Sequence, residues 1–204
     1  MTGGPSNVDR DPWELVPRDE LALLSLDEVL AQVGKRTGDD DEPAAIIAIR
    51  VAPVGFRAIM AHLAHEHRMS FSRLALLSSW HGVTKLEVDP RIQLLRQSYE
   101  STRSAAMDSG DLDALARLNQ NTPHDFQHSQ AIRTTIAVPR TLQARLVDLG
   151  MVCGLPLPRI LVYAVLESTL TLDNSRRYRT VLEEEQMALM RHVEYRNRVL
   201  RLGS

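Results

Sequence analysis

Histidine is the residue type whose spacing in this sequence could hold a metal ion. His62, His65 and His67 lie close together, and Glu66 stands among them. His62 and His65 are three positions apart, so on a helix their imidazoles would share one side. Stable zinc sites fix about four ligands, and nothing in the sequence fixes a third one here. We therefore expect a solvated helix face and no metal, with a metal or pH-sensing role as the less favoured alternative.

Patterns typical of enzymes are not present in the sequence. It contains no Ser-His-Asp arrangement, phosphate-binding loop or glycine-rich dinucleotide motif. Asp111 and Asp113 lie at the start of an expected helix, where carboxylates interact favourably with the helix dipole, so we interpret them as capping residues. Cys153 ends an apolar helix and is expected to be a small buried filler. The sequence thus predicts a protein that is not an enzyme and needs no cofactor.

Composition favours a helix-rich protein of the cytoplasm. Of the 204 residues, 44% are hydrophobic, 25% are charged and only 4% are aromatic, which suits a core of aliphatic side chains. No apolar run approaches the roughly 20 residues that span a bilayer, and the acidic start of the chain is unlike a signal peptide. The single cysteine excludes a disulfide within the chain and favours a reducing compartment.

The net charge of −2 hides a gradient along the chain. Residues 1–45 contain eleven acidic and four basic side chains, whereas residues 131–204 contain eleven arginines and seven acids. A near-neutral chain argues against a nucleic-acid-binding protein, because contacts with phosphates supply most of the affinity. The gradient weakens this objection, since the last third could face phosphates while the acidic start faces elsewhere.

A repeat organises the middle of the sequence. Residues 46–86 and 132–172 align without a gap at a constant offset of 86. Each copy begins with a β-type segment that ends at a proline, Pro53 or Pro139, and continues with helical apolar spacing. The aligned apolar pairs are Phe56 with Leu142, Met60 with Leu146, Leu63 with Leu149, Phe71 with Leu157, Trp80 with Leu166, and Leu86 with Leu172. A unit of this size cannot bury its own apolar face, so we expect the two copies to complete one core.

The second copy changes its period at Pro139. The segment before this proline alternates as a strand does when one of its faces is buried. The alternation places Thr134, Ile136 and Val138 on one face and Arg133, Thr135 and Ala137 on the other. A helical leucine stripe follows and ends at Gly154, a residue suited to the left-handed position after a helix. The next helix is almost wholly apolar up to Leu170, so it must be buried on more than one side.

The second copy resembles the ribbon-helix-helix family of the MetJ, Arc and CopG type, and the first copy resembles it more weakly. The residues that carry the resemblance are Arg-Thr-Thr-Ile-Ala-Val-Pro at 133–139, the stripe of Leu142, Leu146 and Leu149, Gly154, and the helix from Arg159 to Leu170. Members are intertwined dimers whose two antiparallel strands enter the major groove of DNA. The resemblance implies a mostly α-helical fold with a short two-stranded antiparallel ribbon. It further implies a tandem pseudo-dimer, with both halves from one chain, and extra helices around it.

The function implied by the resemblance is sequence-specific binding of double-stranded DNA, as a transcriptional regulator such as a repressor. The implied base contacts are Arg133, Thr135 and Ala137 in the second strand and Arg50 in the first. Arginine can pair bidentately with guanine, threonine can bond a base or touch a thymine methyl, and alanine can only pack. The implied phosphate contacts, at the helix starts, are Arg140, Leu157 and Arg159 in the second copy and Ser70, Ser72 and Arg73 in the first.

The first strand departs from the family pattern. Strict alignment through Pro53 would bury Arg50 and turn Ile47, Ile49 and Val51 outward. Burial of an unpaired arginine costs several kcal/mol, so a shift of one residue is favoured. This shift, with a bulge near Ala52 and Pro53, turns Arg50 outward and buries the apolar trio. The alternatives for this strand are that it contributes one arginine or mainly supports its partner.

Five segments are expected. They are an acidic extension with one short helix at 1–44, the first repeat at 45–87, a helical connector at 88–130, the second repeat at 131–173, and a C-terminal helix within 174–204. The last helix is expected to pack through Val181, Leu182, Leu189 and Val193, or to mediate a homodimer or higher oligomer. A second function class is a protein-interaction module that kept the fold without binding DNA. Within the DNA-binding class, an accessory role in plasmid transfer or partition is equally compatible with the sequence.

Overall fold

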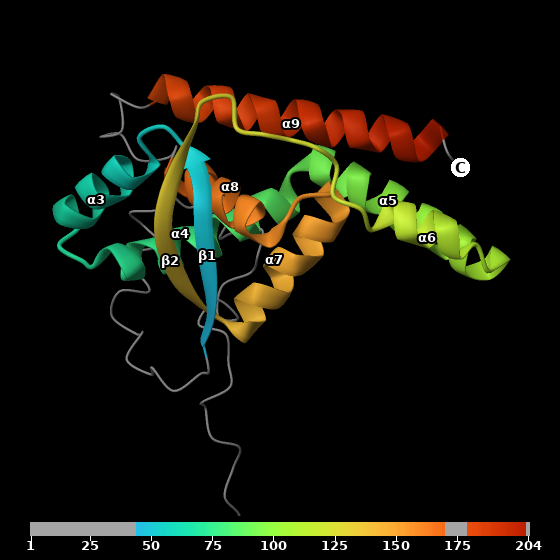
Figure 1. The fold of residues 1–204 in the computed structure, drawn as a ribbon, viewed down its shortest axis with the longest axis horizontal. Coiled ribbons are helices and arrows are strands. Elements are labelled where there is room, and N and C mark those ends of the chain that lie inside the picture. Colours follow the sequence, from blue (N-terminus) through green and yellow to red (C-terminus); the bar gives the residue numbers. More distant parts are fainter. Residues whose placement is uncertain (1–43, 170–178, 203–204) are drawn as a thin grey trace, which may run out of the picture.

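The computed structural model describes residues 44–169 and 179–202, and these residues are mostly helical. The elements, in chain order, are β1 (Ala44–Pro53), α3 (Phe56–Glu66), α4 (Phe71–Val88), α5 (Pro90–Ser109), α6 (Leu112–Leu118), β2 (Ser129–Pro139), α7 (Arg140–Cys153), α8 (Leu157–Thr169) and α9 (Arg179–Leu202). Figure 1 shows their arrangement. The expected helix in the acidic extension lies outside the described residues, as does the segment between α8 and α9.

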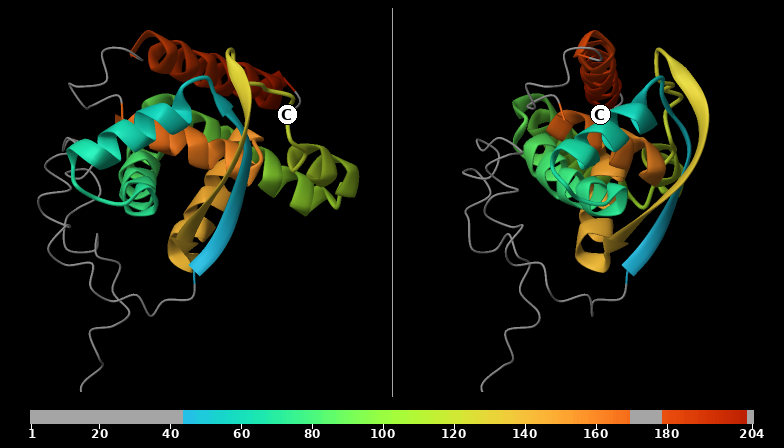
Figure 2. Two further views of the ribbon diagram at one scale, coloured as in Figure 1. Left: turned by 60° about the vertical axis from the view of Figure 1, so that its left-hand side comes forward. Right: turned by 90° about the vertical axis from the view of Figure 1, so that its left-hand side faces the viewer.

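The two strands form an antiparallel ribbon although 75 residues separate them in the chain. Ala44 pairs with Pro139, Ile47 with Ile136, and the pairing continues to Pro53 opposite Ser129. Figure 2 shows the ribbon along one side of the helices. The face toward the helices is apolar, with Ile136 and Val138 fully buried. The side-chain alternation of the second strand is therefore as expected from the sequence.

The first strand agrees only in part with the one-residue shift predicted from the sequence. Ile47 and Ile49 are buried and Arg50 is exposed, as the cost of burying arginine predicts. The prediction for Val51 is wrong, because 42% of this side chain's surface is exposed. The irregularity lies between Ile49 and Val51, not at Ala52. A bulge at this earlier place leaves Arg50 and Val51 both outward and returns the small Ala52 to the core.

Helices α4 and α8 form the most extensive helix–helix contact and lie beneath the ribbon. Small residues allow them to approach closely: a Cβ added at Gly82 would overlap the backbone carbonyl of Ala164. Under the offset of 86 between the repeats, Gly82 corresponds to Ser168 and Ala164 to Ser78. Both serines are completely buried. The two repeats therefore share one core, as the apolar character of α8 predicts.

The remaining helices brace this centre. The connector begins with Pro90 after the Asp89 cap and forms α5, which ends at Gly110 with φ of 69°. Asp111 caps α6 through the N–H of Ala114, which confirms its expected capping role. Helix α9 packs on α5, where Ser98 donates a 2.6 Å hydrogen bond to Asn197.

The C-terminal helix packs largely as its sequence predicts. Leu182, Leu189 and Val193 are buried, whereas Val181 is only half-buried. Gly154 ends α7 in the left-handed conformation, with φ of 65°, as the sequence predicts.

Candidate nucleic-acid interface

The outward face of the ribbon is the site that the two repeats build together. Arg133, Thr135 and Ala137 project from β2, and Arg50 projects from β1; all four are exposed. The described helices cover only the opposite face (Figure 2). Sheet alternation accounts for this arrangement, because every outward residue of β2 is flanked by residues that pack inward. The expected base-contacting residues are thus all exposed on the ribbon, with Arg50 at its edge beside the start of α8.

The strand register brings the two exposed arginines to the same part of the ribbon. Between its flanking pairs, β1 has one residue, Arg50, whereas β2 has two, Ile132 and Arg133. The neighbouring cross-strand pair is Ala48 with Thr135, so small side chains stand beside the guanidinium groups. An arginine with small neighbours can extend toward a flat or grooved partner, because nothing beside it projects further. The sequence could predict both arginines, but not the register that places them at the same level of the ribbon.

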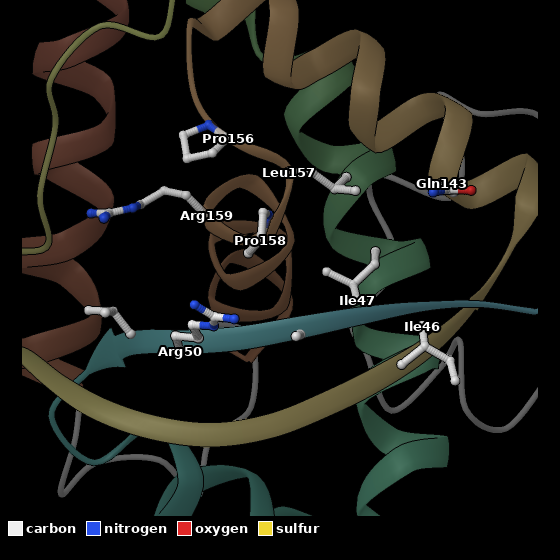
Figure 3. A pocket seen from close by; sticks show the side chains of 10 residues that line it. Ile46, Ile47, Arg50, Gln143, Pro156, Leu157, Pro158 and Arg159 are labelled. Carbon is white, nitrogen blue, oxygen red and sulfur yellow. The ribbon is translucent and has the colours of Figure 1, made fainter.

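A groove of about 490 Å³ runs between β1 and the connection from α7 to α8. Its lining includes Arg50 on one wall and Pro156, Leu157 and Pro158 on the other, with Gln143 at one end. Figure 3 shows Arg50 on the side of the strand that faces Pro158. Within the described residues β1 pairs only with β2, so the strand edge beside this groove makes no ladder bonds. The groove combines apolar walls, the two arginines Arg50 and Arg159, and backbone polar groups.

The helix starts beside the ribbon are chemically different. At α4, Ser70 is the cap and accepts a hydrogen bond from the N–H of Arg73 at 3.2 Å, while Ser72 is exposed. First-turn N–H groups of a helix have no partner within the helix and suit an anion. At α8, Pro158 has no N–H, and the N–H of Arg159 already donates to the carbonyl of Pro156 at 2.8 Å. The start of α4 is therefore better equipped for a phosphate than the start of α8.

The expected phosphate-contacting arginines also differ in their surroundings. Arg140 is exposed at the first position of α7. Arg159 instead donates to Asp125 at 3.1 Å, and its guanidinium lies over the ring of Phe126 at 4.4 Å. Only 15% of the Arg159 side chain is exposed, and Figure 3 shows it directed away from Arg50. In this conformation Arg159 holds the loop before β2 against α8. To contact a phosphate, the Arg159 side chain would have to leave Asp125 and Phe126.

A buried polar cluster behind the interface is the feature that sequence reasoning missed. His124, in the loop before β2, is half-buried and its Nε2 is hydrogen-bonded to the Tyr163 hydroxyl at 2.6 Å. Its ring lies 4.5 Å from that of His192. Burial, followed by the charges of His192 and Arg159, lowers the pKa of His124 to about 4. His124 is therefore neutral at pH 7, and its unprotonated ring nitrogen can accept a hydrogen bond from the Tyr163 hydroxyl.

Arg196 forms the second half of this cluster. Its guanidinium donates to the carbonyls of Val152, Met151 and Leu118 at 2.7, 3.0 and 2.8 Å. These carbonyls end α7 and α6, where the helix dipole favours a cation. Burial lowers the pKa of Arg196, yet its ordinary value is so high that the group stays charged. An available signal was the helical stripe of α9, in which Arg196 occupies an apolar-face position after Leu189 and Val193.

The exposure of the histidines on α3 and the burial of Cys153 are as expected. His62 and His65 are exposed on α3, and within residues 44–169 and 179–202 no group of three possible ligands could hold a metal ion. Cys153 is fully buried, and burial raises its thiol pKa to about 12. A thiol with so high a pKa is unreactive at pH 7, because the thiolate is the nucleophile. Cys153 therefore serves packing.

No single described helix has the length and apolar character needed to cross a membrane. Helices α7 and α8 would meet that requirement only as a pair, and they are bent by 102° where they join. Most of α8 is buried in the shared core. No protein family, curated protein or solved structure matches this chain.

Proposed function

We propose that this chain binds double-stranded DNA sequence-specifically and regulates transcription. In this proposal the two repeats form a tandem ribbon-helix-helix pseudo-dimer, and the β1–β2 ribbon enters the major groove. The observation that carries the proposal is the open outward face of the ribbon, with Arg133 and Thr135 exposed on it and Arg50 exposed at its edge. A two-stranded ribbon fits the width of the major groove, and its outward side chains then meet base edges.

Each outward side chain has a distinct role in the proposal. Arg133 donates two hydrogen bonds to O6 and N7 of a guanine, and Thr135 contacts the adjacent base. Arg50, on the strand edge, reads a second position or binds the backbone along the groove beside α8. Arg140 and the start of α4, with Ser70 and Ser72, bind phosphates and fix the register without reading sequence.

The net charge of residues 44–204 supports DNA binding better than the net charge of the whole chain does. Residues 44–204 contain twenty basic and fifteen acidic side chains, so the part that carries the ribbon is positive. Several arginines of this part are engaged with acids; Arg145, for example, pairs with Glu87 at 2.7 Å. The ribbon arginines Arg50 and Arg133 are exposed. Arg50 and Arg133 are therefore accessible to DNA phosphates and bases.

The two halves of the proposed site are unlike, so the preferred DNA sequence should not be a perfect palindrome. Arg133 lies on one strand only, and the start of α4 offers serines where α8 offers prolines. The test is retention of random-sequence duplexes by the purified chain, followed by sequencing of the retained pool. The proposal predicts enrichment of a short asymmetric motif that contains a guanine; a pool indistinguishable from the input at low salt would contradict it.

A protein-interaction module is the second candidate, and one observation favours it. The ribbon region also exposes apolar side chains: 74% of Ile46 and 48% of Val54 are accessible. Ile46 lies beside the groove along the free edge of β1, where an extended peptide could add a strand. Failure of every duplex to bind, together with capture of an extended peptide that Ile46→Lys abolishes, would favour this candidate.

A further inference from the structure

The acidic start of the chain and the ribbon face carry opposite charge, and they are joined directly. Residues 1–43 contain eleven acidic and four basic side chains. Four of the acids form the uninterrupted run Asp39–Glu42, which ends two residues before β1 begins at Ala44. The run therefore enters the fold at the ribbon itself.

The point of entry places the acidic run within reach of the exposed arginines. Ala44 pairs with Pro139, so the run is attached beside Arg140, which is exposed. Arg50 is six residues along β1, about 20 Å at the rise of a strand. Asp39 is five residues before Ala44, a reach of about 17 Å. A chain that turns back over the ribbon can thus bring this carboxylate to Arg50 once the side-chain lengths are added.

We propose that the acidic run Asp39–Glu42 lies over the outward face of the ribbon and competes there with DNA phosphates. The inference rests on the proposed function and adds regulation to the same site. A carboxylate offers an arginine the same bidentate acceptor geometry as a phosphate. A tethered competitor also acts at an effective concentration in the millimolar range, whatever the protein concentration. Weakly held, non-specific DNA is then displaced, whereas a duplex that also gains base contacts displaces the run.

The competitor should raise discrimination between sequences and lower overall affinity. Binding to random DNA depends almost entirely on phosphate contacts, so it loses most from a carboxylate competitor. Binding to a preferred site gains additional energy from base edges, which the acidic run cannot replace. High salt screens the run and the DNA phosphates alike, so the difference should be largest at low salt.

The first experiment neutralises the run in the full chain and measures DNA affinity. The variant Asp39→Asn, Asp40→Asn, Asp41→Asn, Glu42→Gln should bind a random-sequence duplex about tenfold more tightly at low salt. The matched control makes the same change in net charge at four exposed acids of α5, α6 and α9: Glu100→Gln, Asp108→Asn, Asp113→Asn and Glu194→Gln. The control should bind within about twofold of the parent. Equal tightening by both variants, or no tightening by the first, would overturn the inference while leaving the proposed function standing.

The second experiment detects the contact without DNA. Arg133→Lys places an amine on the ribbon, and a carbodiimide then joins it to any carboxylate in direct contact. Mass spectrometry should find Lys at this position linked to the peptide that contains Asp39–Glu42, and 1 M salt should abolish the link. Arg103→Lys, on the exposed surface of α5, is the matched control and should give no such product. Absence of the link in Arg133→Lys would overturn the inference; its presence in a protein that binds no duplex would reject DNA as the competitor and retain the contact.

Discussion

At the residue scale, two side chains of the buried polar cluster, Arg196 and His124, contribute to the stability of the fold. Arg196 donates to three carbonyls at the ends of α6 and α7, so a side chain without hydrogen-bond donors would leave those of Val152 and Leu118 without this partner. Arg196→Met should lower the free energy of unfolding by about 3 kcal/mol. Urea denaturation followed by circular dichroism measures this. Arg198→Met, exposed on the same helix, is the control, and equal effects of the two would refute the role of Arg196.

The lowered pKa of His124 predicts how the free energy of unfolding changes with pH. Its pKa is about 4 in the folded protein, below the ordinary value of about 6.5 that it has when unfolded. Between these values the unfolded chain binds more protons, so the free energy of unfolding should fall as pH drops from 6.5 toward 4. His192, whose pKa burial also lowers, acts in the same direction. His124→Asn should flatten the dependence of the urea midpoint on pH in this window; an unchanged slope would contradict the assignment.

At the element scale, the crossing of α4 and α8 depends on the absence of a side chain. Gly→Ala in the middle of a helix ordinarily stabilises it by about 1 kcal/mol. At Gly82 the added methyl would overlap the Ala164 carbonyl, so the two helices must separate. We therefore expect Gly82→Ala to destabilise the protein by about 2 kcal/mol or more. Thermal unfolding of the parent and the variant measures the sign, and a stabilised variant would show that α4 and α8 do not cross this closely.

Sequence periodicity predicted the elements well but not the details that build the site. The offset of 86 between the repeats, the alternation before Pro139 and the apolar helix up to Leu170 together predicted the ribbon and its shared core. The bulge beside Arg50 was misplaced, because alternation alone permits a shift at several positions along the strand. The pairing of Arg159 with Asp125 was also missed, since it joins a loop to a helix start 34 residues away.

At the scale of the whole molecule, the charge of the binding face should control affinity for every duplex alike. Arg140 is exposed at the end of the ribbon, where we propose a phosphate contact. Arg140→Ala should weaken binding to preferred and random duplexes by the same factor and reduce the slope of log affinity against log salt by about 1. Titrations at several salt concentrations measure both quantities. A loss confined to the preferred duplex would instead make Arg140 a base reader.

The central claim is that the ribbon reads DNA through Arg133, and one comparison tests it directly. The parent and Arg133→Ala are titrated with the duplex selected by the parent and with a random duplex, at the same salt concentration. Arg103→Ala, on the exposed surface of α5, serves as the charge-matched control. The account predicts that Arg133→Ala loses about 1–3 kcal/mol on the selected duplex, with relaxed preference at one base pair, and much less on the random duplex. Equal binding of the parent and Arg133→Ala to both duplexes would contradict the account.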